Sequence, residues 1–198
     1  MRLLLQFIST FLSEGLPAVI IMMPCYLFFR AAYLSYQTEE NPFYRVNVLK
    51  EGVGLLLFCY LMMLFTQTFS AGEGVSFLEL IPFRVIVTQF ADIGRTEDGL
   101  REFVYNILCN IAVFIPIGLM ISVLTEGRFA LTIAASLGIS LFIESTQLPL
   151  PRTTDVDDLI LNTTGALIGY GLYRLILLCA GKLHNNNKDK NKTQSTSC

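Results

Sequence analysis

The chain has 198 residues, of which 53% are hydrophobic and 15% are charged, and its formal net charge is −2. Soluble domains usually carry about a quarter charged residues, so this composition predicts a membrane protein. The balance of charge argues against a nucleic-acid partner. The five cysteines lie far apart without a CxxC pair, and the single histidine, His184, is near the end of the chain. We therefore predict no disulfide framework, no metal site and no cofactor.

The beginning of the chain allows two interpretations. The apolar run Leu3–Leu12 is too short to cross a bilayer by itself. Gln6, Ser9 and Ser13 recur at helical spacing, which favours an amphipathic helix lying on the membrane surface. The alternative is a single long helix that is kinked at Pro17.

Apolar runs of about 20 residues are long enough to cross a bilayer as helices. Five such runs follow one another along the chain: Leu16–Leu34, Gly52–Phe69, Phe103–Leu124, Phe129–Leu148 and Leu159–Ala180. The sequence therefore predicts an all-α fold, a polytopic transmembrane bundle of about five spans. We divide it into an N-terminal segment with two spans at 1–69, a domain with three spans at 70–180, and a tail at 181–198.

Two segments outside these spans have distinct compositions. The loop between the second and third spans contains the run Phe77–Arg84, which is too apolar for a free loop and is expected to lie on the outer membrane surface. The end of the chain, Asn185–Cys198, is mostly Asn, Lys, Ser and Thr. It lacks the apolar surface needed to fold, so we predict a disordered cytoplasmic tail.

Lys and Arg residues predict the orientation, because cytoplasmic loops are enriched in them. With five spans, nine basic residues fall on the side of the C-terminus and five on the side of the N-terminus. We therefore predict that the N-terminus is outside and the C-terminus is inside.

Polar side chains gather at matching ends of the last three spans. They form three pairs with helical spacing: Asn106 with Asn110, Glu144 with Gln147, and Asp158 with Asn162. Polar groups that face lipid are costly, so three such pairs at one depth are expected to face one another. This predicts a polar pocket that is open to the outside. Arg84 or Arg152 is a candidate to supply its positive charge.

Simpler roles compete with this interpretation. Asp155, Asp157 and Asp158 are placed to cap the fifth span, and the asparagines to hold helices together. Glu144 fits a purely structural role least well, because Gln would form the same hydrogen bonds without a charge. If the protein is an enzyme, Glu144 is the candidate general acid or base.

Small residues and a proline predict how the helices pack. Gly165 and Gly169 form a GxxxG pattern in the fifth span, which is typical of close helix packing. Pro116 and Gly118 are expected to kink or loosen the third span.

Four motifs in order resemble the VanZ-like family of bacterial envelope proteins. Residues 106–118 are similar to the family's Asn followed by Phe-x-Pro-x-Gly, and the other three motifs are Leu80–Phe83, Glu144–Gln147 and Thr154–Gly169. The resemblance extends over about Glu79–Tyr173. It implies a multi-pass protein of the bacterial plasma membrane, in a family whose namesake is linked to resistance to the lipoglycopeptide teicoplanin.

Three functions remain open at this point. The first is a non-enzymatic protein that binds an amphiphile or a lipid-linked envelope component. Its ligand-binding residues would be the following: Arg84, Asn106, Asn110, Glu144, Gln147, Asp158 and Asn162. The second is an intramembrane enzyme acting on a lipid-linked substrate. The third is a structural or assembly module.

Overall fold

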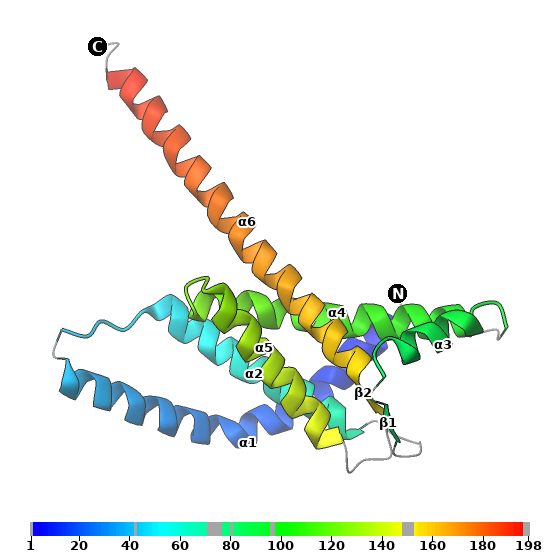
Figure 1. Ribbon diagram of the computed structural model, residues 1–198. Helices are drawn as coiled ribbons and strands as arrows, with labels where there is room; N and C mark the ends of the chain where they lie inside the picture. The colour runs from blue at the N-terminus through cyan, green and yellow to red at the C-terminus, as the bar shows by residue number, and fades with distance from the viewer. Residues whose placement is uncertain are drawn as a thin grey trace. The chain divides into compact units, whose positions relative to one another are not determined.

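The computed structural model describes residues 2–41, 43–70, 77–79, 81–95, 98–147 and 153–195. Six helices and two short strands make up this part of the chain (Figure 1). In chain order they are α1 (Arg2–Glu40), α2 (Val48–Ser70), β1 (Phe77–Glu79), α3 (Arg84–Asp92), α4 (Gly99–Leu124), α5 (Phe129–Gln147), β2 (Thr153–Asp155) and α6 (Val156–Ser195).

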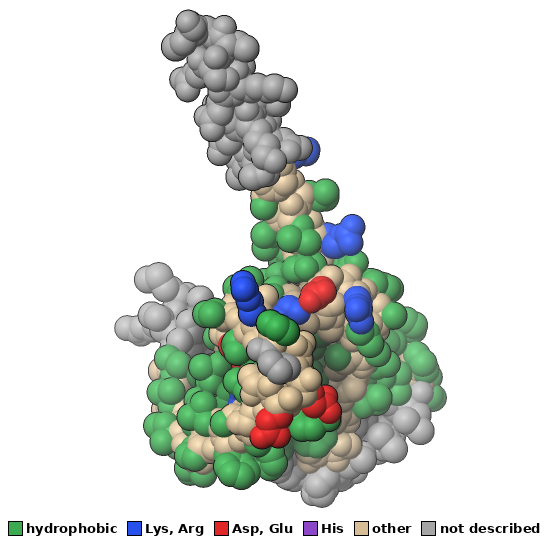
Figure 2. Space-filling view, turned by 90° about the vertical axis from the view of Figure 1, so that its left-hand side faces the viewer, with side chains coloured by type: hydrophobic (Ala, Val, Ile, Leu, Met, Phe, Trp, Pro, Cys, Tyr) green, Lys and Arg blue, Asp and Glu red, His purple; other side chains and the backbone are tan. Residues whose placement is uncertain are grey.

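Five helices of the described part are long and apolar enough to cross a membrane. Their apolar stretches are Leu12–Glu40, Val48–Gln67, Gly99–Leu124, Phe129–Gln147 and Val156–Lys182. Many large apolar side chains on these helices are exposed, which water would penalise and lipid favours. On the face shown in Figure 2, hydrophobic side chains cover a larger area than charged ones. The prediction of a helical bundle with five spans is confirmed.

The beginning of the chain forms one helix with the first span, so a separate surface helix is not observed. α1 runs without interruption from Arg2 to Glu40 and includes Pro17 and Pro24. Figure 1 shows this helix changing direction along its length. Packing explains why it continues, because a Cβ atom at Gly15 would lie 2.8 Å from Cγ of Met63 on α2. Neighbouring helices allow proline inside membrane helices in this way.

The chain divides into two compact units. Unit 1 comprises Met1–Val85 and Leu141–Val156, and unit 2 comprises Ile86–Ser140 and Asp157–Cys198. α5 is shared between them, because its first part belongs to unit 2 and its last part to unit 1. The division into 1–69, 70–180 and 181–198 stays a prediction.

Unit 1 contains the α1–α2 hairpin and a short parallel pairing of β1 with β2. Tyr26 of α1 stacks on Phe58 of α2 with ring centroids 4.5 Å apart. Phe77 pairs with Thr153 and Glu79 pairs with Asp155 across the two strands. The sequence did not indicate these strands, which lie in segments that were expected to be loops.

Unit 2 is built on close contact between α4 and α6. A Cβ atom at Gly165 or Gly169 would overlap the carbonyl oxygen of Ile111 or Ile115, and one at Gly118 would overlap that of Ala166. The GxxxG prediction is confirmed, and α4 is the helix that it packs against. Gly118 serves the same contact from the other side.

The predicted disordered tail is helical as far as Ser195, where α6 ends. A helix that is already formed gains about one backbone hydrogen bond for each residue that it adds, and Lys and Gln are good helix formers. Continuation of α6 therefore requires no apolar surface in the tail itself.

Candidate functional site

A chain of hydrogen bonds links α3, α4 and α6 within unit 2. Nδ2 of Asn106 donates to Oε1 of Gln89 at 3.1 Å, and Nδ2 of Asn110 donates to Oδ1 of Asn106 at 3.1 Å. Nδ2 of Asn110 also donates to Oδ1 of Asp158 at 2.5 Å. We call these four residues, Gln89, Asn106, Asn110 and Asp158, the polar cluster.

The sequence of each helix explains why these side chains meet. Asn106 and Asn110 are four residues apart and therefore lie on one face of α4. Asp158 is seven residues before Gly165, so it projects from the same face of α6 as the GxxxG pattern. Because the glycines bring α6 against the backbone of α4, the short side chains of Asp158 and Asn110 are able to touch.

Asn162 lies one turn further along α6 and contacts α5 instead of the polar cluster. Its Nδ2 donates to Oγ of Ser140 at 2.9 Å, and both side chains are buried. Ser140 continues a row of buried hydroxyl groups spaced four residues apart on α5, which also includes Thr132 and Ser136. The bond between Asn162 and Ser140 links α6 to α5, as small polar side chains commonly do in membrane bundles.

Asp157 points to a different helix from its neighbour Asp158. Its Oδ2 accepts a hydrogen bond at 3.1 Å from the backbone N–H of Ile86, and the residue is only 1% exposed. Ile86 lies in the first turn of α3, where backbone N–H groups have no partner within the helix. Asp157 therefore caps α3 from α6, whereas the sequence indicated a cap on its own helix.

The other predicted site residues belong to unit 1. Glu144 is half-buried, with its Oε2 atom shielded from solvent, and Gln147 is buried. Oε1 of Gln147 accepts no hydrogen bond from the residues that the structure describes. Arg84 is exposed at the start of α3. A ligand-binding role for these three residues stays a prediction, and Arg152 lies outside the described residues.

Two residues of this region were missed in the sequence, Gln89 and Ser140. Gln89 lies in the short helix α3, which follows the apolar run Phe77–Arg84 and was not predicted from the sequence. A signal for Ser140 does exist in the sequence, because Thr132, Ser136, Ser140 and Glu144 recur every four residues. That spacing places all four on one face of a helix.

The polar cluster is rich in hydrogen-bond acceptors. Asp158 is 8% exposed, whereas Gln89, Asn106 and Asn110 are half-buried and so still meet the surroundings of the protein. The start of α6 carries a partial positive charge that stabilises the carboxylates of Asp157 and Asp158. Carboxylate and amide oxygens accept hydrogen bonds from hydroxyl and amino groups. This arrangement is suited to a ligand that carries such donors.

Comparison with known proteins identifies the family. No curated protein and no solved structure matches the chain. The model of the VanZ/LLP1 family matches residues 53–177. The match begins inside α2 and ends inside α6, so it covers the GxxxG packing, the polar cluster and all three polar helix ends. Because this stretch is more than half of the chain, the protein belongs to the VanZ/LLP1 family.

Proposed function

We propose that this protein binds the polar head group of an amphiphile or a lipid-linked envelope component at the polar cluster, in the plasma membrane of a bacterium. The observation that carries the proposal is the hydrogen-bonded chain from Asp158 through Asn110 and Asn106 to Gln89. It joins a carboxylate on a membrane-spanning helix to a short surface helix that has no buried residues.

The charge of Asp158 favours binding over simple helix packing. Asparagine at this position would accept the same hydrogen bond from Asn110 without the cost of placing a carboxylate at a membrane-spanning helix. Packing alone therefore does not require an acid here. A ligand with hydroxyl or amino groups benefits from a carboxylate here, because hydrogen bonds to a charged acceptor are roughly twice as strong as neutral ones.

We also propose that this binding gives the protein a role in tolerance of envelope-directed antibiotics. Teicoplanin is a lipoglycopeptide, so it joins an apolar tail to polar groups in the same way as a lipid-linked envelope component. A protein that holds either molecule at the membrane would change how much of the drug reaches its target. Glu144, near the end of α5 in unit 1, is a separate candidate for this function.

The test is the identity of the lipid that purifies with the protein. Wild type, Asp158→Asn and the exposed control Ser145→Ala would be isolated in mild detergent, and their bound lipids identified by mass spectrometry. We expect one lipid class to be enriched in wild type and Ser145→Ala and lost in Asp158→Asn. Equal lipid content in all three proteins would contradict the proposal, and a chemically altered lipid in wild type alone would point to an enzyme.

A further inference from the structure

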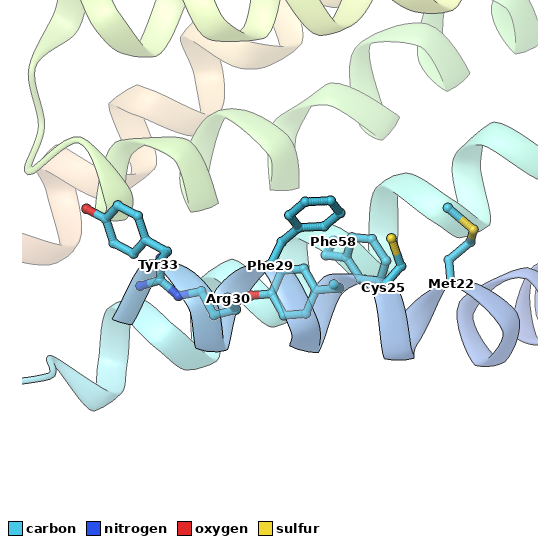
Figure 3. A pocket seen from close by; sticks show the side chains of 7 residues that line it. Met22, Cys25, Phe29, Arg30, Tyr33 and Phe58 are labelled. Carbon is cyan, nitrogen blue, oxygen red and sulfur yellow. The ribbon is translucent and has the colours of Figure 1, made fainter. Parts of the chain in front are cut away.

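A groove of about 390 Å³ lies between α1 and α2 in unit 1, away from any residue assigned above. Its walls include Met22, Cys25, Phe29, Arg30 and Tyr33 of α1, with Phe58 of α2. Figure 3 shows these side chains in a row along α1, with Tyr33 at one end and Met22 at the other. Most of the lining is apolar or aromatic, so lipid tails are better occupants than water.

The length of the groove fits one lipid tail. Met22 and Tyr33 are 11 residues apart on one helix, which corresponds to about 16 Å along its axis. The hydrocarbon core of a bilayer is about 30 Å thick, so each leaflet contributes about half of that. The groove therefore runs along roughly one leaflet, from an apolar end at Met22 to a polar end at Arg30 and Tyr33.

The polar end offers hydrogen-bond donors. Arg30 forms a two-point ion pair with Glu51 of α2, in which its Nε donates to Oε2 at 2.6 Å and its Nη2 lies close to Oε1. The guanidinium group also lies over the ring of Tyr33, with Cζ 4.9 Å from the centroid. These contacts fix the orientation of Arg30. Because a guanidinium has five N–H donors, the Nη1 edge is still able to meet a phosphate.

We propose that this groove binds one phospholipid, with an acyl chain against Phe29 and Phe58 and the phosphate at Arg30. Three observations support a phospholipid over other occupants. The lining is mostly apolar, the N–H donors of Arg30 stand at one end only, and the length matches a leaflet. The proposal is independent of the polar cluster, which takes a donor-rich head group and not a phosphate.

The absence of tryptophan from the chain makes a direct experiment possible. Phe29→Trp places a single fluorophore in the groove, and Leu27→Trp places one at a similar depth on the opposite side of the same helix, outside the lining. Phe29 and Leu27 are both exposed, at 65% and 54%. Each variant would be reconstituted into vesicles of an uncharged diacyl glycolipid that contain increasing fractions of phosphatidylglycerol with brominated chains.

Bromine quenches tryptophan only at short range, so the curves report which lipid sits beside each residue. We expect half-maximal quenching of Phe29→Trp at about one third of the phospholipid fraction that Leu27→Trp requires, because Arg30 adds charge-assisted hydrogen bonds to the phosphate. The pair Arg30→Gln and Glu51→Gln, introduced together into Phe29→Trp, should remove this preference without leaving an unpaired charge between α1 and α2.

Three results would overturn the proposal. Identical curves for Phe29→Trp and Leu27→Trp would mean that only ordinary surrounding lipid is present. A preference that survives the loss of Arg30 and Glu51 would mean that the phosphate is not held there. Phe29→Trp fluorescence that brominated lipid never quenches would mean that the groove is covered by protein, such as a second copy of the chain.

Discussion

Asp157 and Asp158 are adjacent in the sequence but serve different partners. Asp157 accepts a hydrogen bond from the backbone of α3, and Asp158 accepts one from the side chain of Asn110. The first contact satisfies a backbone group that lacks a partner within its helix. The second joins two side chains in a half-buried cluster. Two neighbouring aspartates therefore have different roles: Asp157 is a structural residue, and Asp158 is a candidate binding residue.

Asp157→Ala should loosen α3 by about 1 kcal/mol, the usual effect of losing a helix cap. Hydrogen exchange of the Ile86 amide measures this, and we expect it to become faster. Asp157→Asn should remain close to wild type, because its amide oxygen still accepts the hydrogen bond. The exposed residue Asp92, at the other end of α3, provides the control, and equal exchange in Asp92→Ala and Asp157→Ala would contradict the capping role.

Glu144 allows a test of charge against hydrogen bonding. Glu144→Ala should abolish any effect of the protein on tolerance of envelope-directed drugs while the protein still inserts into the membrane. If the charge is needed, Glu144→Gln should fail equally, and this is the outcome we expect. Drug tolerance and membrane abundance would be measured together. Full activity of Glu144→Gln at normal abundance would show that Glu144 only holds helices together.

Among the elements, the contact between α4 and α6 has the strictest steric requirement. Gly118, Gly165 and Gly169 each face backbone atoms of the other helix, which cannot move aside as a flexible side chain could. The contact also sets the separation of Asn110 and Asp158. The same glycines that pack the helices therefore position the polar cluster.

Gly169→Ala should destabilise the protein by about 1–3 kcal/mol, the usual cost of overfilling a packed contact. Gly171→Ala is the matched control, since nothing lies within 4 Å of a Cβ atom at this position of the same helix. Thermal unfolding in detergent compares the two variants. If both unfold at the wild-type temperature, the packing of α4 against α6 is not as described.

Elements defined by local pattern could be predicted, and those that depend on distant contacts could not. The five spans follow from run length, and the GxxxG contact follows from residue size, so both are readable in the sequence. The uninterrupted α1 was predicted only as an alternative to a surface helix, because Pro17 disfavours a helix locally whereas the packing of α2 along it is not visible in the sequence. The pairing of β1 with β2 joins segments more than 70 residues apart, for which no local signal exists.

The candidate site shows the same limit. The helical spacing of Asn106, Asn110 and Asp158 predicted that each would face inward, and the structure joins these three by hydrogen bonds. Gln89 could not be predicted, because its role depends on where α3 lies against α4. Asn162 has the expected spacing, but its partner is Ser140.

At the scale of the whole molecule, the predicted orientation places the N-terminus outside and the C-terminus inside. The excess of basic residues on the C-terminal side supports it. A variant that retains Cys198 as its single cysteine should resist a membrane-impermeant thiol reagent in intact cells and react after the cells are opened. Labelling of Cys198 in intact cells would reverse the orientation and place the polar helix ends on the cytoplasmic side.

The most direct test of the account is whether added lipid stabilises the protein through Asp158. Delipidated wild type, Asp158→Asn and the exposed control Leu108→Ala would be unfolded by heat with increasing amounts of bacterial polar lipid extract. A ligand at about a hundredfold its dissociation constant should raise the melting temperature of wild type and Leu108→Ala by roughly 5–10 °C. We predict little or no rise for Asp158→Asn, although its hydrogen bond to Asn110 can still form. An equal rise in all three proteins would contradict head-group binding at the polar cluster.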